Sequence, residues 1–281
     1  MSIPLLRRFR RKSHKVALVL AGGAARAIAH IGVLKVLERE KIPFDLIVGS
    51  SMGSIIGAAY SLDKNLQKTE KMALRTSFRD IMDVSFPKLA ISRGEKLRQM
   101  VEKIVQGRSF NDLKIPLAVV ATDIGNGKTM IYQSGDLTQA ITASCSIPII
   151  YNPVKVGNRL IVDGGIKNTV PVAVAKELGA TFTIASNVGF CVRNFTPSNI
   201  FQILMQFYQI QGQALSDYQT MDADIAINSE LGEIDQMAFG RAKECIKRGE
   251  EAAERTLGRL KNRTLQKLKK KILRRSKSKL N

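Results

Sequence analysis

The hydrophobic and polar positions of the first sixty residues alternate between short apolar runs and helical stripes. The apolar runs at 15–21 and 45–48 are short, as is typical of buried parallel strands. Each is followed by apolar residues at helical spacing, at 31–40 and 54–62. This strand–helix–strand–helix order predicts a parallel sheet with helices packed on its faces.

The rest of the chain continues the alternation with a longer excursion. Residues 63–113 are more polar, mostly helical in pattern and broken at Phe86-Pro87, so we expect them to pack over the sheet. A hairpin signal lies at Gly125–Lys128. Further strands are predicted at 116–123, 129–135, 159–165, 181–189 and 223–228, and helices at 198–220 and 236–257. The pattern as a whole predicts an α/β fold.

The net charge of +20 is concentrated at the two ends of the 281-residue chain. Residues 1–15 and 258–281 hold 17 of the 44 basic side chains and no acidic one, so the remainder carries only +3. We therefore divide the chain into a basic N-terminal tail (1–15), a domain (16–257) and a basic C-terminal tail (258–281). Such tails bind polyanions, either a phospholipid surface or nucleic acid.

Targeting and metal signals are weak. No apolar run reaches the roughly 20 residues that span a bilayer. Val16–Ala25 after a basic stretch resembles a signal peptide, but a buried first strand running into a glycine turn is the preferred interpretation. The three cysteines, Cys145, Cys191 and Cys245, form no CxxC pair, which argues against a disulfide framework or a zinc site.

One short stretch suggests nucleophilic catalysis. Gly49-Ser50-Ser51-Met52-Gly53 matches G-x-S-x-G, a pattern that holds a reactive serine on a tight turn between a strand and a helix. The predicted strand and helix flank it as that arrangement requires. The alternative is a plain strand-to-helix turn in which Ser50 or Ser51 caps the helix.

A nucleophilic serine needs a base. His30, just after the first glycine turn, is one candidate, but a packed histidine at the start of a helix is the preferred interpretation. The two histidines, His14 and His30, both precede Ser51, so the serine–acid–histidine order of α/β-hydrolases is excluded. A desolvated carboxylate can serve instead. Asp45 begins the strand that leads to Ser51 and lies at its far end. Asp123 and Asp163 both follow apolar strands, and Asp163 is preferred because Gly164-Gly165 permits close backbone approach.

Backbone N–H donors for an oxyanion are expected from the glycine turn after the first strand. This turn, Gly22 to Arg26, does not fit the dinucleotide-binding pattern G-x-G-x-x-G, because alanine stands at positions 24 and 27.

Three stretches in chain order, AGGAARAIAHIGVL, GSSMG and DGGIKNTVP, resemble the patatin-like phospholipase family, as do ASCSIP and VVATD. The resemblance runs from about Val16 to Glu254. Members of this family use a serine–aspartate dyad without histidine. The resemblance implies a three-layer α/β/α fold with a mostly parallel central sheet, and a serine lipid acyl hydrolase of phospholipase A or lysophospholipase type.

Residue roles follow by position. The resemblance implies that Ser51 is the nucleophile, that Asp163 is its base and that an acyl-enzyme forms, without a metal or cofactor. The implied oxyanion loop is Gly22, Gly23, Ala24, Ala25 and Arg26, with Arg26 bracing it, and the supporting motif glycines are Gly49, Gly53, Gly164 and Gly165.

The chain departs from the family in this loop, which usually reads G-G-G-x-R-G. Ala24 and Ala27 replace two glycines. If either position needs a positive φ, alanine destabilises it by about 1 kcal/mol or more and can tilt the N–H donors. We therefore expect weakened or altered activity. The alternatives are a catalytically silent lipid-binding protein, an acyltransferase or a thioesterase.

The tails suggest a membrane partner. Leu257, Leu260, Leu265, Leu268 and Ile272 fall in one sector of a helical wheel surrounded by basic residues, as in a helix that lies on an anionic membrane. The alternative is a solvated, disordered tail. Nucleic-acid binding is disfavoured because no folded reader motif accompanies the tails. The expected location is cytoplasmic and peripherally membrane-associated, and the expected substrate is a phospholipid or lysophospholipid.

Overall fold

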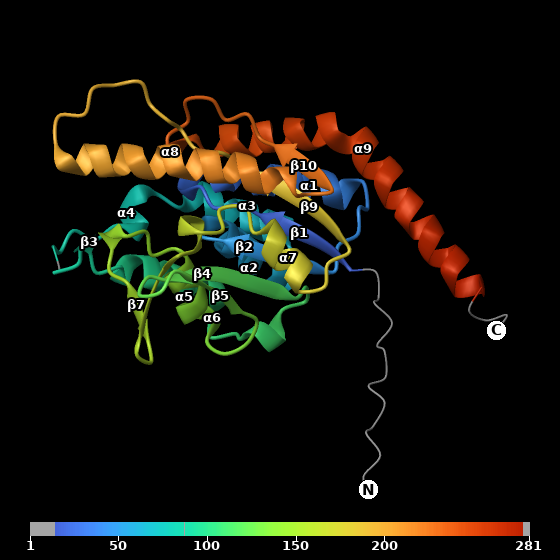
Figure 1. The fold of residues 1–281 in the computed structure, drawn as a ribbon, viewed down its shortest axis with the longest axis horizontal. Helices are drawn as coiled ribbons and strands as arrows, with labels where there is room; N and C mark the ends of the chain where they lie inside the picture. Colours follow the sequence, from blue (N-terminus) through green and yellow to red (C-terminus); the bar gives the residue numbers. More distant parts are fainter. Residues whose placement is uncertain (1–14, 87, 278–281) are drawn as a thin grey trace, which may run out of the picture.

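A computed structural model describes residues 15–86 and 88–277, with side chains to residue 263. Its centre is a sheet in the order β10-β9-β1-β2-β4-β8-β7, with β5 also paired to β4 (Figure 1). The five strands from β10 to β4 are parallel, whereas β5, β7 and β8 are antiparallel to their neighbours. The strands are β1 (Val16–Leu20), β2 (Leu46–Ser50), β4 (Leu117–Asp123), β5 (Lys128–Tyr132), β7 (Val154–Val156), β8 (Arg159–Asp163), β9 (Phe182–Asn187) and β10 (Ile225–Asn228).

Helices cover both faces of this sheet, so the predicted α/β class with a mostly parallel sheet is confirmed. α1 and α2 pack on one face with α9 against α1, and α7 and α8 lie over the other (Figure 1). The helices are α1 (Ala29–Arg39), α2 (Met52–Asp63), α3 (Leu66–Arg75), α4 (Phe78–Ile81), α5 (Glu95–Val105), α6 (Leu137–Ser144), α7 (Val172–Glu177), α8 (Ile200–Met221) and α9 (Ala242–Lys277). Short 3-10 helices occupy Ala24–Ile28, Phe110–Asp112, Gly164–Ile166 and Phe239–Arg241.

The central strands are buried because helices cover both faces. Every residue of β2 and β4 is buried, which explains why these strands are continuously apolar and do not alternate. The predicted hairpin is present, since β4 and β5 pair antiparallel across Gly125–Lys128. The sequence pattern missed a second, two-stranded sheet formed by β3 (Ala90–Ser92) and β6 (Ile149–Tyr151). Strands of three residues are too short to show a period.

The two predicted tails differ in what the structure describes. Apart from Lys15, the N-terminal tail lies outside the described residues. The C-terminal segment continues α9, which runs unbroken past residue 258 to Lys277. Leu260 is fully buried in the core, so this side chain is not available to a membrane. No helix in the described part of the chain is both long and apolar enough to cross a bilayer.

Candidate active site

The turn after β2 places Ser51 in a strained backbone conformation. Ser51 has φ 50° and ψ −131°, a region that residues other than glycine rarely adopt. A Cβ on Gly49 would lie 2.6 Å from Ser54 Cα, and one on Gly53 would lie 2.4 Å from the Leu20 carbonyl oxygen. Both flanking glycines are therefore required by the sharp turn between β2 and α2.

The Ser51 hydroxyl does not cap α2. Although Ser51 precedes the helix, its side chain makes no capping hydrogen bond. Its Oγ instead donates to Asp163 Oδ2 at 2.6 Å, and both residues are buried. The backbone N–H of Ser51 donates to Ser144 Oγ, which in turn donates to the Val120 carbonyl oxygen. These contacts fix the turn against β4 and α6.

Asp163 approaches Ser51 from the end of an antiparallel strand, whereas the sequence argument placed it at the carboxyl end of a parallel one. That argument assumed that Asp163 ends a parallel strand, but β8 runs antiparallel to β4. The register pairs Asp163 with Ala121, one residue beyond the pairing of Ser50 with Val120. Because β4 extends beyond β2, the last residue of β8 lies directly beside the turn that carries Ser51.

Burial makes the carboxyl group of Asp163 a weaker acid. The carboxyl group is fully buried, and desolvation raises its pKa to about 7, although hydrogen bonds from Ser51 and the Gly165 N–H pull in the opposite direction. Gly165 N donates to Oδ1 at 2.6 Å and fixes the orientation of the carboxylate. A base with a pKa near 7 can accept a proton and return it at neutral pH.

The other candidate bases have structural roles. Asp123 binds its own turn, accepting from the Gly125 N–H and the Asn126 side chain at 3.0 Å each. His30 is fully buried between Ser186 Oγ and the Ala21 carbonyl oxygen, and burial lowers its pKa to about 4. Asp45 accepts from the Val16 N–H at the amino end of β2, the end of the strand opposite Ser51, as expected. His14 lies outside the described residues.

Only part of the expected oxyanion loop is free to bind substrate. The backbone N–H groups of Gly22, Ala25 and Arg26 already donate within the protein, to the carbonyl oxygens of Thr169, Gln236 and Gly23. Those of Gly23 and Ala24 have no hydrogen-bond partner among the described residues. The loop abuts the serine, because a Cβ on Gly22 would lie 3.3 Å from Ser51 Cβ. Of the five residues expected to form the oxyanion loop, only Gly23 and Ala24 therefore have backbone N–H groups available to a substrate oxygen.

The departure from the family pattern has different effects at its two positions. Ala24 has φ 47°, in the left-handed region that favours glycine, whereas Ala27 does not have a positive φ. Only Ala24 is therefore strained. Arg26 lies almost completely buried behind the loop, and its guanidinium donates to the carbonyl oxygens of Val188, Gly189, Gly232 and Ile234. The desolvation that accompanies this burial lowers the pKa of Arg26.

Sequence reasoning missed the far wall of the site. A cavity of about 50 Å³ lies beside Ser51 and Asp163, and α8 contributes Met205, Tyr208 and Gln209 to its lining. Gln236 also lines it, is 8% exposed, and has no partner for either side-chain amide atom among the described residues. Gln209 Oε1 is likewise buried without a partner. No motif marks these residues, which come from segments far apart in the sequence.

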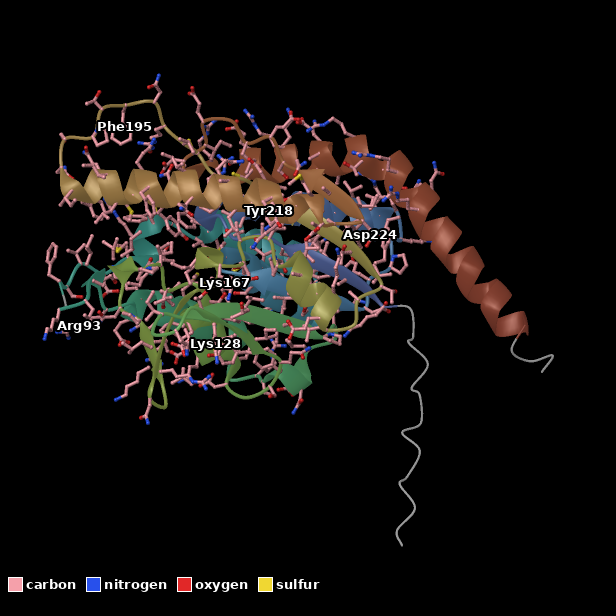
Figure 2. All side chains as sticks on the ribbon, in the orientation of Figure 1. Arg93, Lys128, Lys167, Phe195, Tyr218 and Asp224 are labelled. Atoms are coloured by element: carbon pink, nitrogen blue, oxygen red, sulfur yellow. The ribbon has the colours of Figure 1, made fainter. Side chains whose placement is uncertain are left out.

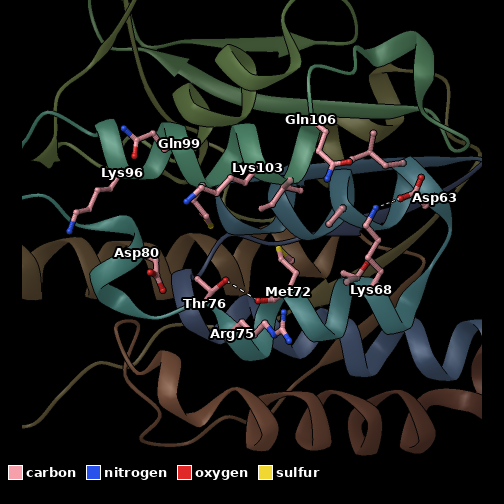
Figure 3. Close-up of a pocket in the computed structure, with 15 residues that line it drawn as sticks. Asp63, Lys68, Met72, Arg75, Thr76, Asp80, Lys96, Gln99, Lys103 and Gln106 are labelled. Atoms are coloured by element: carbon pink, nitrogen blue, oxygen red, sulfur yellow. Dashed lines mark hydrogen bonds and ion pairs between the residues drawn. The ribbon is translucent and has the colours of Figure 1, made fainter.

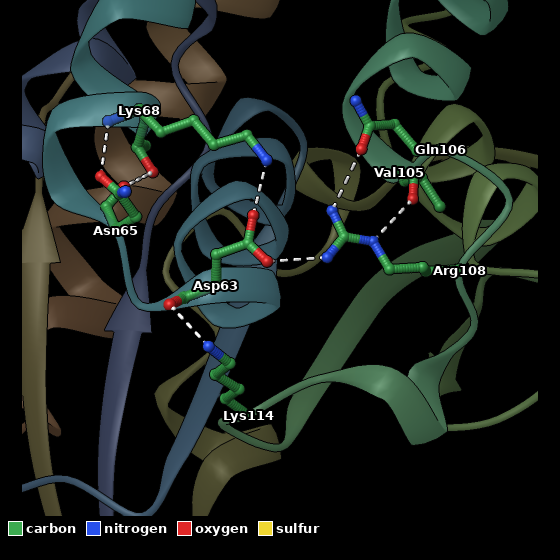
Figure 4. A network of polar contacts seen from close by, with 8 residues as sticks. Asp63, Asn65, Lys68, Val105, Gln106, Arg108 and Lys114 are labelled. Carbon is green, nitrogen blue, oxygen red and sulfur yellow. Dashed lines mark hydrogen bonds and ion pairs between the residues drawn. The ribbon is translucent and has the colours of Figure 1, made fainter.

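A larger groove lies elsewhere. It has a volume of about 460 Å³ and lies between α3 and α5, with Met72 and Lys103 among its lining residues (Figure 3). Asp63, at the opposite end of α2 from Ser51, borders it and pairs with Lys68 and Arg108 (Figure 4). Hydrogen bonds from these two cations lower the pKa of Asp63 to about 2. The groove contains none of the predicted site residues.

The comparisons with known proteins agree with the motifs. The family model described as patatin-like phospholipase matches residues 18–176. The patatin-like phospholipase domain-containing protein 6 of Mus musculus is 33% identical over 184 residues, which are 62% of this chain and 13% of that protein. The lysophospholipase NTE1 of Debaryomyces hansenii is 33% identical over 202 residues, or 70% of this chain and 13% of the relative.

Shorter relatives and a solved structure extend the comparison. An uncharacterized NTE family protein of Mycobacterium tuberculosis is 39% identical over 176 residues, covering 62% of this chain and 49% of the relative. The chain thus matches at most about half the length of these curated relatives. The crystal structure of VipD from Legionella pneumophila superposes with a TM-score of 0.53 at 13% identity, over 87% of this chain and 67% of VipD, and shows a shared fold.

Proposed function

This chain belongs to the patatin-like phospholipase family, and on that premise we propose that it hydrolyses carboxylic esters of phospholipids or lysophospholipids. The observation that carries the proposal is the 2.6 Å hydrogen bond from Ser51 Oγ to Asp163 Oδ2 on a strained turn beside a cavity. The names of the relatives, phospholipase and lysophospholipase, support a lipid ester as the substrate.

The first half of the reaction forms an acyl-enzyme. Asp163 accepts the proton of the Ser51 hydroxyl as Oγ attacks the ester carbonyl carbon. The negative charge that develops on the carbonyl oxygen is stabilised by the N–H groups of Gly23 and Ala24, with the side-chain amide of Gln236 as a further donor. When the tetrahedral intermediate collapses, the C–O bond to the lipid alcohol breaks, and Asp163 returns the proton to the departing oxygen.

The second half releases the fatty acid. Asp163 accepts a proton from water, which attacks the acyl carbon and forms a second tetrahedral intermediate at the same donors. Collapse breaks the bond to Ser51 Oγ, which recovers its proton from Asp163. Each half uses one group as base and then as acid, for which a pKa of about 7 is suited.

A catalytically silent lipid-binding protein is the second candidate, and the strain at Ala24 favours it. A tilt of the Ala24 N–H away from the carbonyl oxygen would remove one of the donors. Loss of one oxyanion donor lowers kcat on the order of a hundredfold. The hydrolase takes precedence because the retained Ser51–Asp163 hydrogen bond would have no use in a lipid carrier.

The membrane partner proposed from the sequence is an anionic surface bound by the basic tails, which makes the protein peripherally membrane-associated in the cytoplasm. Residues 1–15 and 258–281 carry the charge for such binding. The substrate lipids would then be those of the same membrane.

A fluorophosphonate probe tests the hydrolase proposal, since it forms a covalent bond to activated serines. We expect the wild type to be labelled, and labelling to fall by at least roughly a thousandfold in Ser51→Ala and Asp163→Asn. Matched controls are Ser50→Ala, the neighbouring serine, and Asp123→Asn, the other carboxylate at a strand end; both should be labelled like the wild type. Failure of a folded wild type to react would favour the silent lipid-binding candidate.

A further inference from the structure

Helix α8 exposes a stripe of large apolar side chains, whereas its buried positions hold small residues. Ile200, Ile203, Phe207 and Ile210 are 50% to 70% exposed and recur at three- and four-residue spacing, so they form one outward stripe. The buried positions of the same helix are instead Gly212, Ser216 and Thr220. This is the reverse of an ordinary surface helix, whose apolar stripe faces the core.

The region around this stripe is also uncharged. No acidic or basic residue occurs between Asn194 and Ser216. Phe195, in the loop before the helix, is exposed as well. Contiguous apolar surface of this kind indicates a contact with a membrane or another macromolecule.

A second group of exposed apolar side chains lies just before β3, at the end of the molecule where α8 begins (Figure 1). Val84, Phe86 and Leu89, just before β3, are 59% to 74% exposed. β3 pairs with β6, and Ile150 of β6 lines the catalytic cavity together with Met205 of α8. We call the two groups together the catalytic-edge surface: Val84, Phe86, Leu89, Ile200, Ile203, Phe207 and Ile210.

Cations border this surface. Arg79 and Arg93, on either side of the 84–89 group, and Lys88 within it are exposed. In Figure 2, Arg93 and Phe195 both lie at the end of the molecule where α8 begins. Exposed apolar side chains next to basic ones match the layers of a bilayer, where acyl chains lie beneath anionic phosphates.

Helix α8, which carries part of the catalytic-edge surface, also lines the cavity beside Ser51. α8 begins near the carboxyl ends of the parallel strands, whereas β1 begins and α9 ends at the opposite end of the molecule (Figure 1). The cavity beside Ser51 has only about 50 Å³, against roughly 300 Å³ or more for ordinary ligand pockets. A lipid must therefore displace the α8 side chains that line it.

We infer that the catalytic-edge surface docks onto a phospholipid bilayer, so that α8 lies in the interface and the catalytic cavity opens toward the lipid. This inference rests on the proposed function for its substrate, but the surface itself is defined by exposure alone. A second copy of the chain is the main competing occupant, because stripes such as that of α8 also pair helices. Helix pairing would not account for Val84, Phe86 and Leu89, which project from a separate loop segment.

Docking through apolar side chains differs from binding through the basic tails in its response to salt. Charge attraction is strongly screened at about 0.5 M salt, where the screening length is about 4 Å, and it requires anionic lipid. Apolar insertion persists at that salt and occurs on zwitterionic phosphatidylcholine. The two modes are therefore separated by vesicle composition and salt.

Tryptophan fluorescence reports the docking directly, because the chain contains no tryptophan. In Phe207→Trp and Phe86→Trp we expect a blue shift on adding phosphatidylcholine vesicles in about 0.5 M KCl. The control is Tyr218→Trp, an exposed position on α8 that lies outside the catalytic-edge surface. Its emission should stay unchanged. No shift at 86 and 207, or an equal shift at 218, would overturn the inference.

Charged substitutions give the second test. Ile203→Glu with Phe207→Glu should lower vesicle partitioning in high salt on the order of a hundredfold, or about tenfold for each lost apolar side chain. Tyr218→Glu, the matched control, should partition like the wild type. The double variant and the Tyr218→Glu control should hydrolyse a water-soluble short-chain ester at the wild-type rate, which separates loss of docking from failure of the proposed activity. A wild-type dimer that Phe207→Glu dissociates would assign the surface to a second copy instead.

Discussion

Ser51 and Ala24 both have positive φ values within the catalytic site, at 50° and 47°. At Ser51 the strain accompanies the sharp turn that points the hydroxyl at Asp163. At Ala24 the strain accompanies a backbone N–H that has no partner in the described part of the chain. Two sparsely populated conformations in one site indicate that its surroundings hold it in place, through Ser144 at the Ser51 turn and the buried Arg26 behind the Ala24 loop.

Replacing the two alanines of this loop by glycine should have opposite effects. Ala24→Gly should raise the free energy of unfolding by about 1 kcal/mol, because glycine adopts a left-handed φ without strain. Ala27→Gly should lower the free energy of unfolding by about 1 kcal/mol. Position 27 lies in a helical turn with ordinary backbone angles, so glycine relieves no strain there and only increases the entropy of the unfolded chain. Urea unfolding of both variants measures the difference. Equal signs would contradict the assignment of strain to Ala24.

The side chain of Gln236 should matter for rate and not for stability. Gln236→Met keeps the approximate volume and removes two buried amide atoms that have no partner in the described part of the chain, so the protein should be as stable as the wild type or more so. If the amide donates to the oxyanion, kcat should fall on the order of a hundredfold with little change in KM. Gln211→Met, at an exposed position of α8, is the control. An unchanged kcat would remove Gln236 from the mechanism.

At the residue scale, the sequence identified candidate site residues wherever they belong to a short motif. Ser51 with its flanking glycines, and Asp163 with Gly164-Gly165, could be singled out because tight turns require glycine there. Gln236 and Tyr208 could not, because only tertiary packing brings them to the cavity. The choice of Asp163 over Asp123 rested on the glycine pair that follows it. The argument that named both aspartates assumed parallel strands, whereas β8 is antiparallel to β4, because an apolar pattern shows where a strand ends but not its orientation.

At the element scale, α1 and α9 approach each other through glycines. A Cβ on Gly32 would lie 1.9 Å from the Ile246 carbonyl oxygen, and one on Gly249 would lie 2.0 Å from that of Ala29. The two helices thus pack backbone against backbone. This contact holds α9 on the domain.

Gly249→Ala should separate these helices and destabilise the protein. Backbone atoms cannot give way as side-chain ends can, so we expect a loss of at least about 2 kcal/mol in the free energy of unfolding. On the same helix, a Cβ at Gly258 would meet no atom of the described residues within 4 Å, so Gly258→Ala should stabilise the protein by up to about 1 kcal/mol through helix propensity. Thermal melts of the two variants provide the comparison, and a tolerated Gly249→Ala would contradict the close crossing.

The element scale also shows what periodicity leaves open. The helical pattern at 198–220 predicted α8 almost to its ends, Ile200 and Met221. Periodicity identifies an apolar stripe but not what the stripe contacts, and here it faces outward. The strands β3, β6 and β7 have three residues each, which is too few to show a period of two.

At the scale of the whole molecule, the ionisation of Asp163 that the proposed mechanism requires also lowers stability. Burial raises the pKa of Asp163 from 3.8 to about 7, so between these values the folded protein holds a proton that the unfolded chain has released. The free energy of unfolding attributable to Asp163 therefore falls as pH rises through this range. Over the upper part of the same range the carboxylate forms, and the rate of acyl transfer should rise, with a midpoint near pH 7.

A comparison of the wild type with Asp163→Asn isolates this effect. His30 acts in the opposite direction, because burial lowers its pKa from 6.5 to about 4 and stability from this group rises with pH across that interval. Both proteins contain His30, so the difference between them removes its contribution. From about pH 5 to about pH 8 the variant should gain roughly 3 kcal/mol of unfolding free energy relative to the wild type. Parallel stability curves would show that Asp163 is already ionised at about pH 5, and the rate should then show no midpoint near 7.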